Sequence, residues 1–209
     1  STVAPDYEVF PVGADLNVRW LPASDDVDTT ATLLYQVTCQ PDGGFPSVTY
    51  GPSVGGVTPS DGLGHYEVTA CSGDGIYDVW VDVTDSEGNT SGFPTLTGTV
   101  DTTPPTLPVV TPPDYTVFAT GGALNVYWRP ASDALTPTAE LEYRVMCTPA
   151  GGTAVESLAW TQGQSLPTEA SGRYVVAACV GSGTFDVQVE VRDGLENTSV
   201  FPTLTGTVP

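Results

Sequence analysis

The feature that most constrains the fold of this chain is an internal repeat. The octapeptide FPTLTGTV occurs at Phe93–Val100 and again at Phe201–Val208, 108 positions further along the chain. The same offset relates further identical pairs: Trp20 and Trp128, Tyr35 and Tyr143, Cys39 and Cys147, and Cys71 and Cys179. A repeat of this period indicates two copies of one structural unit, each large enough to bury a core of its own.

The repeat also predicts the domain boundaries. We expect a first domain at residues 1–101 and a second at 113–209, with residues 102–112 as a proline-rich linker that leads into the second domain. Within that linker, Pro104, Pro105 and Pro108 favour extended backbone. The linker is therefore predicted to be short and stiff.

The charge balance excludes several classes of partner. The 209 residues include 25 acidic side chains and five arginines but no lysine, for a formal net charge of −20. Because phosphate groups are bound by cationic side chains, we expect no nucleic-acid partner and no binding to anionic membranes. No apolar stretch approaches the roughly 18 residues of a membrane helix, so we expect no membrane insertion. The start, STVAPDYEVF, does not resemble a signal peptide and lacks an initiator methionine, which suggests that preceding residues have been removed.

Hydrophobic side chains alternate with polar ones along most of the chain. One example is the segment LNVRW, in which Leu16, Val18 and Trp20 share a face. Another is Tyr77, Val79, Val81 and Val83, which the second repeat matches with Phe185, Val187, Val189 and Val191. A period of two, interrupted by clusters of Gly, Pro, Asp and Ser, is typical of half-buried antiparallel strands. The sequence predicts an all-β fold of two tandem sandwiches.

The four cysteines fall two to a repeat, and each pair is separated by 32 positions. This pattern favours one disulfide within each domain. The alternatives are free buried thiols or a metal site, although the chain has no C-x-x-C motif and only one histidine. Disulfides would place the protein in an oxidising compartment, so we expect it to be secreted, extracellular or on a cell surface.

Each repeat resembles a fibronectin type III domain or a related bacterial immunoglobulin-like surface repeat. The residues that carry the resemblance are Trp20 in LNVRW for strand B, Tyr35 in YQV for strand C, and HYEVTACSGDGIYDVWVDVTDSEGN for strands E and F and the turn into G. The linker DTTPPT is similar to the linkers of such surface repeats. One departure is that the strand F tyrosine, Tyr77, becomes Phe185 in the second repeat.

The resemblance implies a pairing for the cysteines. In this topology strand C ends at the same pole of the sandwich as the turn between strands E and F. Cys39 would then lie within bonding distance of Cys71, and the resulting disulfide would join the two sheets. Cys147 and Cys179 would do the same in the second repeat.

The resemblance also brings two acidic loops to one pole of each sandwich. Carboxylate oxygens are ligands that Ca²⁺ prefers, so we predict candidate calcium sites there, although no cofactor is required for the fold. The alternative is that these residues only form turns. The candidate ligands of the first repeat are Asp25, Asp26, Asp28, Asp85 and Glu87, and those near the second are Asp101, Asp133, Asp193 and Glu196.

Two further kinds of site follow from the sequence. Asn89 and Asn197 begin N-x-S sequons at equivalent positions, so they are candidate glycosylation sites. Leu34 and Trp80 are expected to point outward on neighbouring strands of the first repeat, where the second repeat has charged or polar residues. We predict an interaction patch there, unless a neighbouring loop or strand covers Trp80.

The case for an enzyme is weak. The segment GPSVG at Gly51–Gly55 matches G-x-S-x-G, but that motif requires a strand-to-helix turn in an α/β fold, so Ser53 is not expected to be a nucleophile. His65 is replaced by Arg173 in the second repeat, and we expect it to be an exposed, inert strand residue.

The sequence therefore favours a non-enzymatic extracellular structural or adhesion protein. It would be a subunit of a surface filament or a repetitive rod, with self-association or other surface proteins as partners. The segments Thr2–Phe10 and Thr95–Val100 are expected to be edge strands, through which subunits could associate by strand addition. The alternative is a carbohydrate- or protein-binding accessory module of a secreted protein, with glycans among its partners.

Overall fold

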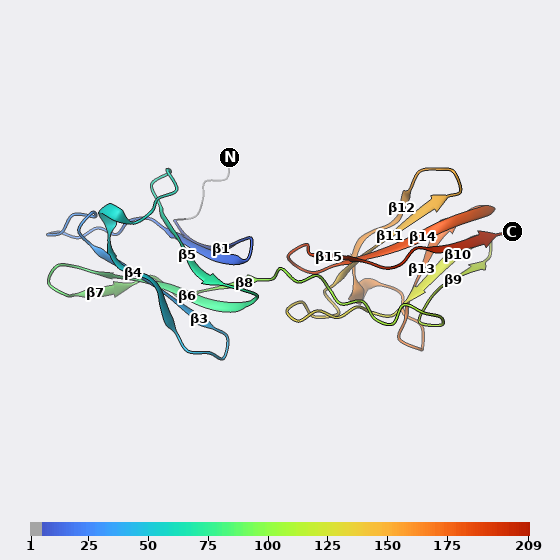
Figure 1. Ribbon diagram of the computed structural model, residues 1–209, viewed down its shortest axis with the longest axis horizontal. Coiled ribbons are helices and arrows are strands. Elements are labelled where there is room, and N and C mark those ends of the chain that lie inside the picture. Colours follow the sequence, from blue (N-terminus) through green and yellow to red (C-terminus); the bar gives the residue numbers. More distant parts are fainter. Residues whose placement is uncertain (1–5) are drawn as a thin grey trace. The chain divides into compact units, whose positions relative to one another are not determined.

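The structure is a computed structural model that describes residues 6–209. The chain divides into two compact units, unit 1 at Ser1–Thr102 and unit 2 at Thr103–Pro209. Each unit is a sandwich of two antiparallel sheets, which confirms the predicted fold class (Figure 1). The first part of the predicted edge strand Thr2–Phe10, residues 2–5, lies outside the described residues.

The described part of unit 1, residues 6–102, contains eight strands in two sheets. The smaller sheet has the order β1-β2-β5, and the larger sheet has the order β4-β3-β6-β7, with β8 also paired to β6. The strands are β1 (Tyr7–Val12), β2 (Asp15–Trp20), β3 (Leu34–Pro41), β4 (Ser47–Val54), β5 (Tyr66–Ser72), β6 (Gly75–Thr84), β7 (Thr90–Gly92) and β8 (Leu96–Val100). The two predicted edge strands correspond to β1 and β8.

Unit 2 repeats this architecture. Its smaller sheet has the order β13-β10-β9 and its larger sheet β12-β11-β14-β15, with β16 paired to β14. The strands are β9 (Tyr115–Thr120), β10 (Ala123–Trp128), β11 (Glu142–Pro149), β12 (Val155–Gln162), β13 (Tyr174–Val180), β14 (Gly183–Arg192), β15 (Thr198–Val200) and β16 (Leu204–Val208). A three-stranded sheet that faces a five-stranded sheet, with the chain crossing between the sheets after β10, β12 and β13, is a fibronectin type III-like arrangement.

The alternating residues fill the space between the sheets as predicted. Trp20 and Tyr35 are fully buried, and their rings are 5.9 Å apart, as measured between centroids. The hydroxyl of Tyr35 accepts a hydrogen bond from the amide of Ala23 at 2.9 Å, which fixes the chain just after β2. In unit 2 the hydroxyl of Tyr143 accepts the equivalent bond from Ala131 at 2.8 Å.

Both predicted disulfides are present, and each one joins the two sheets of its unit. Cys39 on β3 is bonded to Cys71 on β5, with the Cα atoms 5.8 Å apart. Cys147 on β11 is bonded to Cys179 on β13, with the Cα atoms 5.6 Å apart. These distances lie within the usual range for a disulfide.

The repeated octapeptide has a clear packing role. Phe93 follows β7, and β8 then passes across the side chain of Leu16 on β2. A Cβ atom on Gly98 would lie 2.8 Å from the methyl carbons of Leu16, and one on Gly206 would lie 2.7 Å from those of Leu124. Glycine is therefore required at this position because a side chain would overlap the core.

The only helical segments among the described residues are two short 3-10 turns, η1 (Gly55–Val57) and η2 (Gly163–Ser165). No helix in this part of the chain has the length and apolar character needed to cross a membrane.

Most of the proline-rich linker is packed onto unit 2. Thr106 and Ser132 form an isolated antiparallel bridge, in which the amide of Thr106 donates to Ser132 at 2.7 Å and the amide of Ser132 donates back at 3.0 Å. Pro105 is buried, and the side chains of Leu107 and Val110 pack against the core of unit 2. The segment is thus a structural part of unit 2.

Candidate functional site

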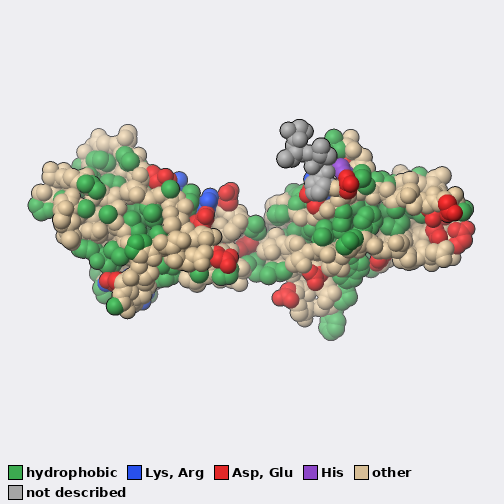
Figure 2. Space-filling model, turned by 180° about the vertical axis from the view of Figure 1, so that it is seen from behind, with side chains coloured by type: hydrophobic (Ala, Val, Ile, Leu, Met, Phe, Trp, Pro, Cys, Tyr) green, Lys and Arg blue, Asp and Glu red, His purple; other side chains and the backbone are tan. Residues whose placement is uncertain are grey.

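The two acidic loops of unit 1 meet at one pole of the sandwich, as the resemblance implies. The amide and the hydroxyl of Ser86, in the loop after β6, both donate to Asp28 Oδ2 at 2.9 Å, and Asp28 lies in the loop after β2. Asp25 Oδ1 accepts bonds from the amides of Val27 and Asp28, so it shapes its own loop. Figure 2 shows acidic side chains gathered at the end of unit 1 that carries these loops.

Most of these carboxylates already serve the loop structure. The side-chain amide of Asn89 donates to Asp85 at 2.7 Å, and this bond is the main factor that holds the pKa of Asp85 below its usual range. The bonds from Ser86 likewise lower the pKa of Asp28. Within the described part of unit 1, no three potential ligand atoms lie within 4.8 Å of one another. The structure therefore does not bring Asp25, Asp26, Asp28, Asp85 and Glu87 together as one ligand set.

At the corresponding pole of unit 2, two of the candidate carboxylates lie close together. Asp193 is 2% exposed, and its carboxylate accepts bonds from the amides of Leu195 and Asn197 and from the side chain of Asn197. Asp133 Oδ1 accepts bonds from the amides of Leu135 and Thr136. Oxygen atoms of Asp133 and Asp193 lie within 4.8 Å of each other.

The remaining candidate ligand within unit 2, Glu196, takes part in an ion pair. Glu196 is largely exposed and is paired with Arg192 at 3.3 Å. Asp101 is a buried residue directly after β8, at the end of unit 1.

Both sequons lie where β7 and β15 begin. Asn89 is exposed and Asn197 is half-buried. Their side-chain nitrogens donate to Asp85 and Asp193, at 2.7 and 2.8 Å. Each asparagine thus already closes a turn, and glycosylation stays a prediction at both positions.

A groove with a volume of about 420 Å³ lies at this same pole of unit 1. We call it the unit 1 groove. It is lined on one side by the segment after β2, which includes Ala23, Ser24 and Asp25, and on the other by Ser91, Phe93 and neighbouring residues. Its floor includes Leu33 and Val83. The groove was not predicted from the sequence. The signal that could have indicated it is that several of its lining residues recur at the same positions in the second repeat.

The outward patch predicted on unit 1 is only partly exposed. Trp80 on β6 is half-buried and lies opposite Thr38 on β3, whereas Leu34, also half-buried, lies opposite Thr84. The pair Gln36 and Asp82 separates them along the strands. Leu34 and Trp80 therefore share a face but do not form a continuous apolar surface.

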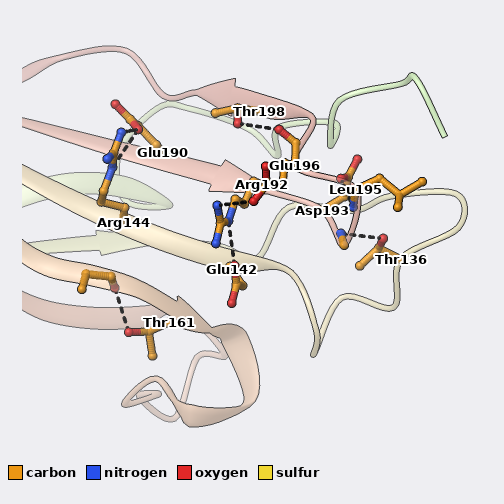
Figure 3. Close-up of polar contacts among 12 residues, drawn as sticks. Thr136, Glu142, Arg144, Thr161, Glu190, Arg192, Asp193, Leu195, Glu196 and Thr198 are labelled. Atoms are coloured by element: carbon orange, nitrogen blue, oxygen red, sulfur yellow. Dashed lines mark hydrogen bonds and ion pairs between the residues drawn. The ribbon is translucent and has the colours of Figure 1, made fainter. Parts of the chain in front are cut away.

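The equivalent face of unit 2 carries a set of ion pairs around a tryptophan. Arg144 is paired with Glu190, and Arg192 Nε donates to Glu142 at 2.7 Å (Figure 3). Both guanidinium groups also stack on the ring of Trp160, with their Cζ atoms 4.7 and 4.5 Å from its centroid. This arrangement occupies the ring of Trp160 from within the unit itself.

The structure places the two candidate catalytic residues, Ser53 and His65, in different segments of unit 1. Ser53 lies on strand β4, not at a strand-to-helix turn. The expectation that His65 is exposed is wrong, because it is only 6% exposed. The loop before β5 folds back so that Asp61 Oδ2 lies 2.7 Å from His65 Nδ1. Glu169 and Arg173 form the corresponding pair in unit 2, so this histidine occupies a structural position.

Comparisons with known proteins add little beyond the fold. No protein-family model matches the chain, and no curated protein matches it. A solved structure with a similar fold is that of the chicken CNTN1 FN1–FN3 domains. The two share 15% sequence identity with a TM-score of 0.44, and the match covers 96% of this chain and 66% of that one. The chain thus spans just under two thirds of the length of that structure.

Proposed function

We propose that the chain is a non-enzymatic structural or adhesion protein of the cell exterior, built from repeated sandwiches that act as rigid modules. The observation that carries this proposal is the same cross-link in both units. Cys39–Cys71 and Cys147–Cys179 each tie one sheet to the other across the core. Such bonds constrain the unfolded chain and are retained in oxidising compartments, where modules of this kind work.

The distribution of polar contacts supports a structural role. The hydrogen bonds and ion pairs described above fix turns, strand faces and the chain after β2. Where the two units differ, they differ in surface charge and in the loop pole. Differences of this kind affect which partner a module contacts.

Electron microscopy of natively purified material tests the proposal. The proposed role predicts filaments or rods whose repeat corresponds to two modules, together with labelling of the cell exterior by an antibody to this chain. Dispersed particles located inside the cell would contradict it. The change Trp80→Ala distinguishes this role from the alternative of a ligand-binding accessory module. A binding module would lose its ligand and keep its fold, whereas a structural tryptophan would lower the stability when removed.

Calcium binding is a separate prediction and concerns Asp133 and Asp193 most directly. The proximity of their oxygens supports it, and carboxylate oxygens suit this cation. Calorimetric titration with Ca²⁺, before and after the change Asp133→Asn, tests it. The prediction is contradicted if the unmodified chain shows no heat of binding.

A further inference from the structure

The residues that line the unit 1 groove recur in unit 2, where a segment of the chain covers them. In unit 2 they are Ala131 and Ser132 after β10, and Ser199 and Phe201 near β15. Each residue is identical to its counterpart 108 positions earlier, namely Ala23, Ser24, Ser91 and Phe93. These counterparts all line the unit 1 groove.

In unit 2 the occupant is the chain's own segment Thr103–Val110. Backbone bonds join Thr106 to Ser132 in both directions, at 2.7 and 3.0 Å. On the opposite wall the hydroxyl of Ser199 donates to the carbonyl oxygen of Pro105 at 2.6 Å. The side chains of Leu107 and Val110 extend this contact onto the core. The segment is thus held by backbone groups on both walls and by apolar packing.

In unit 1 no described segment covers the same groups, because the counterparts of Thr103–Pro108 would lie before Ser1. The backbone of Ser24 makes no backbone hydrogen bond within the described part of the chain. Ala23 and Phe93 are half-buried, whereas Ala131 and Phe201 are each 1% exposed. The unit 1 groove therefore retains the donors, acceptors and apolar wall that hold an extended segment in unit 2.

The charge of the groove narrows the choice of occupant. Asp25 and Asp85 line the unit 1 groove, and their counterparts in unit 2 are also acidic, namely Asp133 and Asp193. The segment Thr102–Pro113, TTPPTLPVVTPP, contains no charged residue, although 25 of the 209 residues in the chain are acidic. An uncharged segment avoids repulsion from these carboxylates, and its prolines reduce the entropy lost when it becomes ordered.

We propose that the unit 1 groove binds an extended, uncharged, proline-containing segment supplied by another module of this repeat type. The segment would pair with the backbone of Ser24 and accept a bond from the hydroxyl of Ser91, as Thr106 and Pro105 do in unit 2. A leucine in the position of Leu107 would pack against the core of unit 1, as Leu107 packs against the core of unit 2. That the segment comes from another module rests on the structural role proposed above.

The test uses the full chain labelled with ¹⁵N and a capped synthetic peptide with the sequence of Thr103–Thr111. Addition of the peptide should shift the amide resonances of Ala23, Ser24, Ser91 and Phe93 in a saturable way. The resonances of Ser132 and Ser199 should not move, because their groove is already filled. A scrambled peptide of the same composition and a peptide with Leu107→Asp should not produce these shifts.

A matched pair of variants sharpens the test. Ser91→Ala removes the side-chain donor on the groove wall and should weaken peptide binding about fivefold, the effect expected for one hydrogen bond of roughly 1 kcal/mol. Ser199→Ala makes the same change in unit 2 and should leave peptide affinity unchanged.

Absence of shifts at the groove amides, or equal shifts with the scrambled peptide, would overturn the assignment. The proposed function can fail independently. If the peptide binds in the groove but native material forms no repeating assembly, the groove assignment stands and the structural role does not.

Discussion

Units 1 and 2 share a core, a cross-link and a strand order, and they differ most at the loop pole and on one sheet face. At the pole of unit 2 the segment Thr103–Val110 covers residues whose counterparts in unit 1 are covered by no described segment. The comparison shows that the buried positions keep the fold while the surface positions determine what each unit can contact.

The sheet face formed by strands β3 and β6 in unit 1 differs from its counterpart in unit 2. Where unit 1 pairs Leu34 with Thr84, unit 2 pairs Glu142 with Arg192 across the same register. Unit 1 carries 15 acidic residues and one arginine, whereas unit 2 carries ten and four. Unit 2 thus neutralises much of its own charge, and unit 1 is the more strongly acidic module.

Removal of the disulfides should have the largest effect and should affect the two units equally. Replacing Cys39 and Cys71 with alanine opens a loop of 32 residues, and the same holds for Cys147 and Cys179. We expect each change to lower the free energy of unfolding of its own unit by roughly 3–4 kcal/mol. Calorimetry of the full chain would resolve the unfolding of the altered unit. An unchanged transition after either double substitution would contradict the equivalence of the two cores.

Adding a side chain at the glycine of the octapeptide should lower the stability of both units by similar amounts. In Gly98→Ala and Gly206→Ala the new methyl group would overlap Leu16 or Leu124, so we expect a loss of about 1–3 kcal/mol in each case. Urea denaturation measures both changes. Gly62→Ala is not a suitable control because its φ is +78°, whereas Gly56, with its nearest neighbour at 3.4 Å, provides one.

A change in the linker should distinguish the units. Leu107→Asp removes an apolar side chain from the core of unit 2 and places a charge beside it, which should cost unit 2 roughly 1–2 kcal/mol. Unit 1 should be unaffected. Val109→Asp is the matched control, because Val109 is 64% exposed and its replacement should change stability by less than about 0.5 kcal/mol. Equal losses in the two variants would show that the segment does not support unit 2.

The tyrosines beside the two grooves should respond differently to the loss of their hydroxyl. Tyr115 donates to the carbonyl oxygen of Pro202 at 2.6 Å, so Tyr115→Phe should cost about 1 kcal/mol. The buried hydroxyl of Tyr7 has no partner among the described residues, so Tyr7→Phe should be neutral or stabilising. Urea denaturation near neutral pH compares the two. A larger loss for Tyr7→Phe would contradict this difference.

Tyr7 should also make the stability of unit 1 depend on pH in the alkaline range. Burial, with a contribution from the charge of Asp82, raises the pKa of Tyr7 to about 12. Because the folded state then holds the proton more tightly than the unfolded state, the contribution of Tyr7 to stability is present below about pH 10. It is lost as the pH rises from about 10 to about 12. Tyr7→Phe should weaken this decline in unit 1, and an unchanged pH profile would count against it.

Much of the fold could be predicted because its signals are local and repeated. The alternation in LNVRW predicts the buried face of Leu16, Val18 and Trp20, and all three are fully buried. The pairing of Cys39 with Cys71 followed from the resemblance, since it requires knowledge of which strands share a pole.

What could not be predicted depends on segments that fold back over a distance. His65 is buried because Asp61 turns toward it, and no periodicity in the sequence signals that contact. The groove in unit 2 is filled because Thr106 meets Ser132 across 26 positions. The linker composition predicted extended backbone but not the surface on which it lies.

Hydrogen exchange at the amides of Ser24 and Ser132, followed by NMR on the full chain, tests the central comparison most directly. We expect the Ser132 amide, bonded to Thr106 at 3.0 Å, to be protected and the Ser24 amide to exchange nearly freely. The linker peptide should confer protection on Ser24. Similar protection at the two amides without added peptide would contradict this difference between the two units.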